Sequence, residues 1–376
     1  MNFADILSDI RQVSGLTTKY NATLKRGINH GGELFASAKD WPHYLDRSHL
    51  TTADDYATGT VSVTNGNTAL TFSGATLTAA MAGRKIRIGD DEAWYDILSV
   101  NTGAGTAVMK QPYQGTTDTD ATFSIFQDEY RLDANVLKVA NLRNTEDGIV
   151  MMPLSYLEFD MLNPSPDQYD DPLWFTYIGR RDETYETGTV SSTAGSKTLT
   201  GVSTAWTGVL GLGKGSRISI VDTSEVYTVK SVDSDTSITT YEAAVAAASG
   251  STYIAHMNNI RVQVRDIPDA ARNLYYRFYR RPRPLVADYD EPDMPLEHHY
   301  ALVWAGLAVA YDLTGDKEKA ALARASFQRF IDLQWLQLAR GVASVKAVKQ
   351  SMDIGDALVG PRYPSSYGRP LVWTPS

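Results

Sequence analysis

The sequence predicts an α+β protein, in which helices and a few strands form a core and two small all-β modules are inserted into it. The first reason is an internal repeat, because residues 58–78 and 187–207 align without a gap and both begin with TGTV. A repeat of this length decides what counts as a domain. The second reason is the spacing of apolar residues, which is helical at the start of the chain and over residues 293–340.

Each repeat copy has the composition of short strands joined by tight turns. Thr, Val, Ser and Gly dominate, and apolar residues alternate with polar ones over residues 85–88. Such runs between Gly and Asn turns are typical of β-strands. We therefore expect two small barrels or sandwiches, over residues 57–127 and 186–256. The matches continue through both copies, where Gly83, Ile86, Ile88, Tyr95, Ser99 and Val100 correspond to Gly215, Ile218, Ile220, Tyr227, Ser231 and Val232.

The N-terminal part of the predicted core, residues 1–56, reads as helical. An amphipathic helix is expected to end at Gly15, and a second helical stretch is expected over residues 16–34, weakened by its glycines. The aromatic segment at Trp41 is expected to pack on the core. The apolar residues at helical spacing in the first helix are Phe3, Ile6, Leu7, Ile10 and Val13.

The core is expected to continue over residues 128–185 and 257–340. Two helices in a hairpin are predicted near its end, because Gly315 suits the C-cap of the first and Asp316 the N-cap of the second. Prolines and weak periodicity predict an extended C-terminal arm over residues 341–376. The other expected elements are strands at 130–133, 136–142, 174–178, 259–264 and 274–279 and a short helix at 155–162.

Composition limits the possible classes of protein. The chain has no cysteine, which excludes disulfides and thiolate metal sites. Its net charge of −9 argues against a tight binder of duplex DNA. The N-terminus lacks the apolar run of a signal peptide, and no stretch approaches the roughly 20 apolar residues of a membrane span.

Three segments that resemble catalytic or metal-binding motifs have simpler structural interpretations. The run Gly208–Gly215 nearly spells a phosphate-binding loop, but Gly215 stands where Ser or Thr is needed. The adjacent histidines at 298 and 299 point apart on a helix, so a helix N-terminus is favoured over a metal site. The acidic segment 288–293 lacks the glycine and distal glutamate of a calcium loop. We therefore expect no catalytic residue, metal or cofactor, and no enzyme.

The segment Tyr275–Pro284 is the only concentrated cluster of basic and aromatic residues. On a strand its members alternate between two faces. Such a cluster binds nucleic acid by stacking and charge, or it packs aromatic residues and pairs its arginines with acids, within the chain or on a neighbouring subunit. The last version yields four inter-subunit candidates: Arg277, Tyr279, Arg280 and Arg281.

The order of signals outside the repeats resembles the head–tail adaptor (connector) proteins of tailed bacteriophages. The repeats themselves resemble β-modules found in some phage virion proteins. The residues that carry the resemblance are the N-terminal helices ending at Trp41-Pro42, Glu129–Asp133 with the strand 136–142, Trp174–Tyr177, Asn259–Val264, Ile267–Asp269, Tyr275–Pro284, and Met294–His298 with the helices that follow.

The resemblance implies a helical adaptor core and a structural role in the virion. Such proteins form a ring, commonly of twelve subunits, between the portal protein and a tail or tail-completion protein. DNA passes through the ring during packaging and ejection without sequence-specific binding. The implied location is the virion neck, after assembly in the host cytoplasm and without a membrane. The C-terminal arm would reach the portal, with interface candidates Arg362, Tyr363, Tyr367, Arg369 and Trp373.

Two other functions remain open from the sequence. A tail fibre or carbohydrate-binding virion protein would use the β-modules, with Trp94 and Trp206 as sugar platforms, although these residues are not equivalent in the two copies. A polysaccharide-degrading enzyme would need a pair of catalytic carboxylates in one cleft, and the sequence places no such pair.

Overall fold

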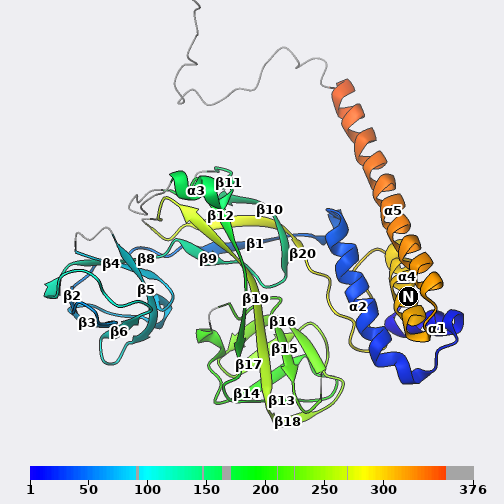
Figure 1. The fold of residues 1–376 in the computed structure, drawn as a ribbon, viewed down its shortest axis with the longest axis horizontal. Coiled ribbons are helices and arrows are strands. Elements are labelled where there is room, and N and C mark those ends of the chain that lie inside the picture. The colour runs from blue at the N-terminus through cyan, green and yellow to red at the C-terminus, as the bar shows by residue number, and fades with distance from the viewer. Residues whose placement is uncertain are drawn as a thin grey trace, which may run out of the picture.

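The computed structural model describes residues 1–89, 93–145, 148–162, 171–209, 211–223, 225–268 and 270–352. It contains both helices and many strands, as predicted for an α+β protein. Figure 1 shows a group of helices on one side, a β-module on the opposite side, and a second β-module below the central strands. Each of these parts, and the central strands, has its own cluster of buried apolar side chains.

Four helices form the helical head: α1 (Phe3–Ser14), α2 (Asn21–Ala38), α4 (His299–Thr314) and α5 (Lys317–Met352). Asn2 begins α1 with a capping box, because its side chain accepts from the Asp5 amide at 2.9 Å and the Asp5 carboxylate accepts from the Asn2 amide at 2.9 Å. Gly15 ends this helix in the left-handed conformation, as expected. Short 3₁₀ turns lie at Thr18–Tyr20, Pro42–Tyr44 and Leu296–His298.

Glycines bring the helices of the head close together. A Cβ on Gly31 of α2 would lie 2.3 Å from the Cβ of Ala305 on α4. A Cβ on Gly306 would lie 2.2 Å from the Ile10 side chain of α1. The glycines that weaken α2 as an isolated helix therefore permit its packing against α4.

The aromatic segment at Trp41 packs in the core of the helical head, as expected. The indole stacks on Phe35 with centroids 4.5 Å apart, and its Nε1 donates to the Phe35 carbonyl at 2.7 Å. Trp335 of α5 meets the same indole edge-on at 5.7 Å. One buried tryptophan thus joins α2 to α5.

The prediction that residues 1–56 are helical was wrong for their last part. Strand β1 (Leu45–Thr51) pairs antiparallel with β20 (Asn273–Arg280), which also pairs with β10 (Val136–Asn144). None of the residues of β1 is fully buried, and exposed residues alternate with half-buried ones. The strand therefore lacks the buried apolar alternation by which a strand is recognised from sequence.

The two β-modules have the same strand order. The first comprises β2 (Thr60–Val63), β3 (Ala69–Ser73), β4 (Lys85–Ile88), β5 (Trp94–Asn101), β6 (Thr106–Met109), β7 (Asp118–Ala121) and β8 (Phe123–Phe126), arranged β7-β2-β3-β6-β5-β4-β8. The second repeats this order as β18-β13-β14-β17-β16-β15-β19, from β13 (Thr189–Ser192), β14 (Thr198–Val202), β15 (Arg217–Ile220), β16 (Glu225–Ser234), β17 (Ser237–Thr240), β18 (Ala248–Ser251) and β19 (Tyr253–Arg265). Each module also has a 3₁₀ turn, at Ala79–Met81 and at Trp206–Gly208.

Equivalent residues perform the same task in both modules. The Tyr56 hydroxyl accepts from the Thr76 amide at 2.6 Å, and the Tyr185 hydroxyl accepts from the Ala205 amide at 3.0 Å. The chain also enters and leaves each module at neighbouring positions, because Tyr56 bridges to Ile125 and Tyr185 pairs with Ala255. Adjacent ends are the geometry that an insertion requires, and the insertion itself stays a prediction.

The second module is continuous with the central strands. Strand β19 runs through the predicted boundary at 256/257, pairing with β15 in the module and with β12 (Trp174–Tyr185) and β9 (Glu129–Arg131) in the centre. The boundary drawn from sequence therefore divides one strand. Strand β11 (Met152–Leu154) pairs parallel with β12, and α3 (Tyr156–Leu162) follows it.

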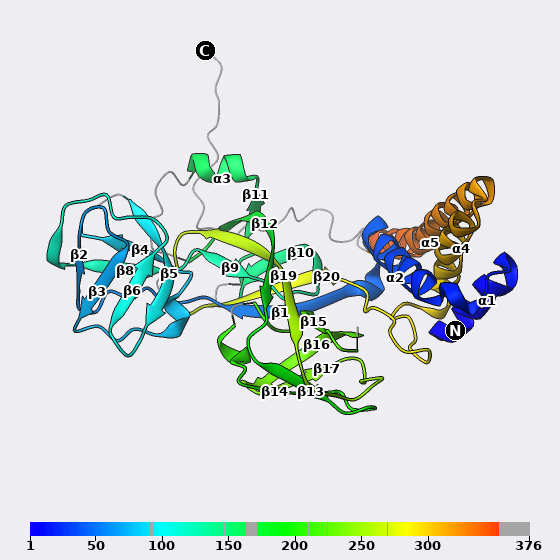
Figure 2. The same cartoon turned by 60° about the horizontal axis from the view of Figure 1, so that its bottom comes forward.

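Helix α5 is longer than the sequence predicted. It continues to Met352, so the first residues of the expected extended arm, 341–352, are helical. This segment contains no proline, and its alanines, lysines, glutamine and methionine are residue types that favour helix. In Figure 2 the helices of the head lie together at one end of the molecule. Of the helices in the described ranges, none is long and apolar enough to cross a membrane.

Candidate assembly surfaces

The basic and aromatic segment Tyr275–Pro284 forms β20 and the turn after it, and its residues alternate as predicted. Leu274, Tyr276 and Phe278 are buried in the central core. Tyr275 and Arg277 point to the opposite face of the three-stranded sheet β1-β20-β10.

Three arginines gather around one tyrosine on this opposite face. Arg47 of β1 lies opposite Arg277 of β20, and Arg143 of β10 lies opposite Tyr275. The Arg143 guanidinium lies 4.6 Å from the centre of the Tyr275 ring. All three arginines are exposed. We call Arg47, Arg143, Arg277 and Tyr275 the arginine cluster.

The arginine cluster holds positive charge that the described part of the chain does not neutralise. Desolvation opposes ionisation of the Tyr275 phenol, but hydrogen bonds from Arg277 and Arg47 outweigh it and lower the phenol pKa. Among the described residues no carboxylate forms an ion pair with Arg47, Arg143 or Arg277. Like charges placed opposite each other on a sheet repel.

The other two inter-subunit candidates on β20 have contacts within the chain. Arg280 forms an ion pair with the buried carboxylate of Asp293, and its guanidinium lies 5.3 Å from the Tyr44 ring centre. Tyr279 lies next to Lys138, whose ammonium is 6.0 Å from the ring centre and pairs with Asp40 at 2.9 Å. Arg280 thus anchors the turn that leads into the helical head.

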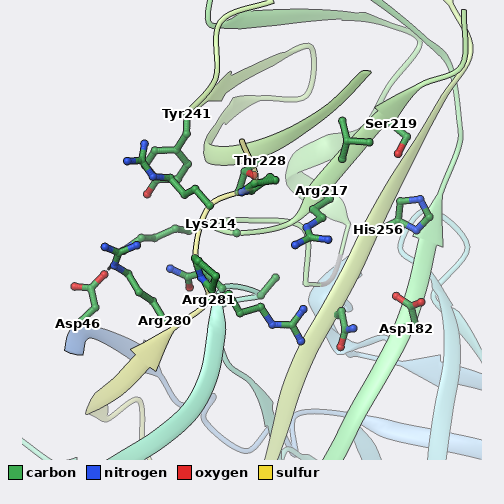
Figure 3. Close-up of a pocket in the computed structure, with 18 residues that line it drawn as sticks. Asp46, Asp182, Lys214, Arg217, Ser219, Thr228, Tyr241, His256, Arg280 and Arg281 are labelled. Carbon is green, nitrogen blue, oxygen red and sulfur yellow. Dashed lines mark hydrogen bonds and ion pairs between the residues drawn. The ribbon is translucent and has the colours of Figure 1, made fainter. Parts of the chain in front are cut away.

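A cavity of 640 Å³ lies where β20 ends, between the second β-module and the central sheet. Figure 3 shows Arg280 and Arg281 on one side and Arg217, Ser219 and His256 of the module on the other. Burial, and then the charge of Arg217, lower the pKa of Arg281. Within the described residues the buried Nε of Arg281 has no hydrogen-bond partner.

Most cations around this cavity are paired with acids, and the pairs join separate parts of the fold. Lys214 of the second module pairs with Asp46 of β1 at 3.3 Å, and Arg217 pairs with Glu33 of α2 at 3.0 Å. These contacts fix the module against the helical head and the central sheet. The charges around the cavity therefore largely compensate each other. Among the described arginines that line it, only Arg281 forms no ion pair with a described carboxylate.

The first β-module is joined to the centre by a buried ion pair. Lys85 of β4 lies 2.7 Å from Asp128 and 3.4 Å from Glu129, and Asp128 also accepts from the Gln263 amide of β19 at 2.6 Å. Burial lowers the pKa of Lys85, but the attraction of Asp128 and the hydrogen bond to it outweigh burial and raise it. The lysine is therefore charged in its site.

The nearly complete phosphate-binding loop is a structural turn, as expected. Gly211 and Gly215 both have positive φ, and a Cβ on Gly215 would lie 2.2 Å from the Asn135 amide nitrogen. Strand β15 follows at Arg217, so no helix N-terminus is presented to a phosphate.

The adjacent histidines lie in the core of the helical head. His298 packs 5.2 Å from Trp41 and 5.3 Å from His43, and His299 Nε2 lies 3.1 Å from the Met294 carbonyl. Within the described ranges no group of three or more His, Asp or Glu residues is arranged to hold a metal ion. Burial, then His298 and then Arg280 lower the pKa of His43 to about 4.

The acidic segment 288–293 fastens the N-terminal helix. The carbonyls of Asp288 and Asp290 accept from the amides of Ala4 and Phe3 at 2.9 and 2.8 Å. The Asp288 carboxylate pairs with Lys25 at 2.7 Å. These acids therefore have structural partners within the chain.

The structure describes both tryptophans that were named for sugar binding, but none of the residues that were named for portal contact. Trp206 is fully buried and its Nε1 donates to the Tyr253 hydroxyl at 2.8 Å, so it offers no platform to a sugar. Trp94 is 37% exposed. The portal candidates Arg362, Tyr363, Tyr367, Arg369 and Trp373 lie outside the described residues.

An exposed apolar group that sequence reasoning missed surrounds α3. Met161 is 75% exposed and Tyr156 is 72% exposed, while Phe159 alone faces inward. This helix projects from the central strands in Figure 2. Its run of apolar residues is the signal that could have revealed the group. The exposed members are Ile149, Val150, Met152, Tyr156, Leu157, Met161 and Leu162.

Comparison with known proteins supports a phage adaptor. Residues 177–348 match the family model described as SU10 adaptor protein, a span from β12 through the second module and β20 into α5. No curated protein matches the chain. Among solved structures, Phage phi92 endosialidase aligns at 13% identity over 61% of this chain. The TM-score of this alignment is 0.17, which is too low to indicate a shared fold. The chain spans only 32% of that structure's length.

Proposed function

We propose that this protein is a head–tail adaptor of a tailed phage, which joins the portal protein to a tail or tail-completion protein as a ring of subunits. The observation that carries the proposal is the match of residues 177–348 to the SU10 adaptor family. The matched span of this chain contains β20, α4 and most of α5. The role is structural, without catalysis, in the neck of the virion. DNA passes through the ring without sequence-specific recognition.

The surfaces of the chain support a role in assembly. The arginine cluster and the apolar group around α3 are two exposed surfaces on one subunit, and Arg281 is a half-buried guanidinium without an acidic partner among the described residues. Exposed apolar groups of this kind mark protein–protein contacts. In the proposal Arg277, Tyr279 and Arg281 contact a neighbouring subunit, and the segment after α5 reaches the portal through its aromatic residues and arginines.

Sedimentation of the purified protein with portal rings tests this proposal. We expect the protein to sediment alone as a large oligomer, or to join the portal fraction in a fixed ratio of many copies per ring. A protein that remains monomeric and stays out of the portal fraction would contradict the adaptor function. The neighbouring genes give an independent check, because portal and capsid genes are expected nearby.

A further inference from the structure

Three arginines that form no ion pair with a described carboxylate gather on one face of the sheet β1-β20-β10. Lys138, on the same face, pairs with Asp40, and Lys214 behind the sheet pairs with Asp46. Among the described residues, Arg47, Arg143 and Arg277 have no such pair. The chain has 44 acids against 35 bases, so a patch of uncompensated cations goes against its overall charge.

The cluster is unfavourable in an isolated subunit. Arg47 and Arg277 are direct partners across β1 and β20, and the hydroxyl of Tyr275 receives hydrogen bonds from both. Like charges directly opposite each other destabilise a sheet. An arrangement that costs stability in the subunit becomes favourable when an anionic group is bound, because guanidinium groups bind carboxylates bidentately.

We propose that the arginine cluster is a docking site for an acidic surface on a second copy of this chain. This inference rests on the proposed ring and names one of its contacts. Each subunit of a closed ring presents two different, complementary surfaces. The chain has an excess of acids to supply the second one. Asp118 and Asp120 of the edge strand β7, for example, are exposed and have no ion pair with any described residue.

The chemistry of the face favours a protein over a nucleic acid. Arg143 lies over the ring of Tyr275, 4.6 Å from its centre, and so occupies the place that a stacked base would take on that face of the ring. Leu45, 44% exposed, and Tyr279 lie in the adjacent cross-strand row. Arginine, tyrosine and an exposed leucine together are typical of a protein interface. The net charge of −9 also repels DNA at long range.

The test compares two double variants with the same change in net charge. Arg47→Gln with Arg277→Gln removes the opposed pair, and Lys110→Gln with Lys197→Gln is the control on the β-modules. Mass photometry at increasing concentration measures assembly, and thermal unfolding of the monomer measures stability. For the arginine variant we expect the concentration at half-assembly to rise about tenfold or more, since arginines at the centre of interfaces contribute most of the binding energy.

The stability measurement separates docking from a structural role. The unfolding temperature of the arginine variant should equal or exceed that of the wild type, because repulsion is removed. A fall in that temperature, or unchanged assembly while the wild type forms rings, would overturn the docking site and leave the adaptor function standing. A wild type that stays monomeric even with portal present would contradict both. Loss of DNA binding with unchanged assembly would assign the cluster to nucleic acid instead.

Discussion

Lys85 shows how a single residue connects a β-module to the rest of the molecule. Its side chain is 10% exposed, and that of its partner Asp128 is 3% exposed. A buried charge pair gives little net stability compared with apolar residues, but removing one partner leaves the other charge buried and unpaired. The connection is therefore sensitive to loss of either residue.

We predict that Lys85→Met lowers the free energy of unfolding by about 3–5 kcal/mol. Lys110→Met is the matched control, because Lys110 forms an exposed pair with Asp96 at 3.7 Å and such pairs contribute less than about 1 kcal/mol. Urea unfolding of both variants measures the difference. Equal losses in the two variants would show that the Lys85 pair does not fasten the module.

His43 predicts an acid-sensitive helical head. Its pKa is lowered from 6.5 to about 4 by burial and then by His298 and Arg280. The unfolded chain therefore binds protons before the folded head does, and stability falls as the pH drops from 6.5 towards 4. We expect a loss of about 1–2 kcal/mol from His43, reduced because solvent screens the half-buried ring.

Thermal unfolding at pH 7.5 and pH 5 measures this loss. The variant His43→Gln should show a smaller decrease between the two pH values than the wild type, because the glutamine does not titrate. An identical decrease in both proteins would assign the acid sensitivity to other groups.

At the scale of elements, the contact between α2 and α4 depends on a glycine. In most helices Gly→Ala stabilises by about 0.5–1 kcal/mol. Gly31 should behave in the opposite way, since its Cβ would lie 2.3 Å from the Ala305 Cβ. We predict that Gly31→Ala destabilises the protein by about 1–3 kcal/mol. At Gly32 the nearest atom is 3.7 Å away, so Gly32→Ala should be neutral or stabilising. Thermal unfolding of the two neighbouring variants checks the sign of each effect.

The strands differ in how well they could be predicted from the sequence. The β-modules were predictable because apolar residues such as Val61 and Leu70 alternate with small or polar ones and recur in the second copy. Strand β1 was not, because it buries no apolar face. The alternation along β20 was predicted, whereas the convergence of Arg47 and Arg143 on Tyr275 depends on the register of three strands far apart in sequence.

At the scale of the molecule, α5 and the segment after it carry the predicted link to the portal. Leu338 of α5 packs against the core of the helical head, and the portal candidates lie in the segment that follows α5. We therefore predict that deleting residues 342–376 leaves the subunit folded and abolishes attachment to the portal. Circular dichroism measures folding and co-sedimentation measures attachment. A second variant that lacks only residues 353–376 keeps the whole of α5. Comparing the two deletions shows whether the end of α5 or the segment after it is needed for attachment to the portal.

Mass photometry of the protein mixed with purified portal rings tests the adaptor function most directly. We predict a single complex whose mass equals one portal ring plus a fixed ring of many subunits, twelve by the resemblance to other adaptors. Free portal rings beside free monomers, at every protein concentration and ionic strength tested, would contradict it.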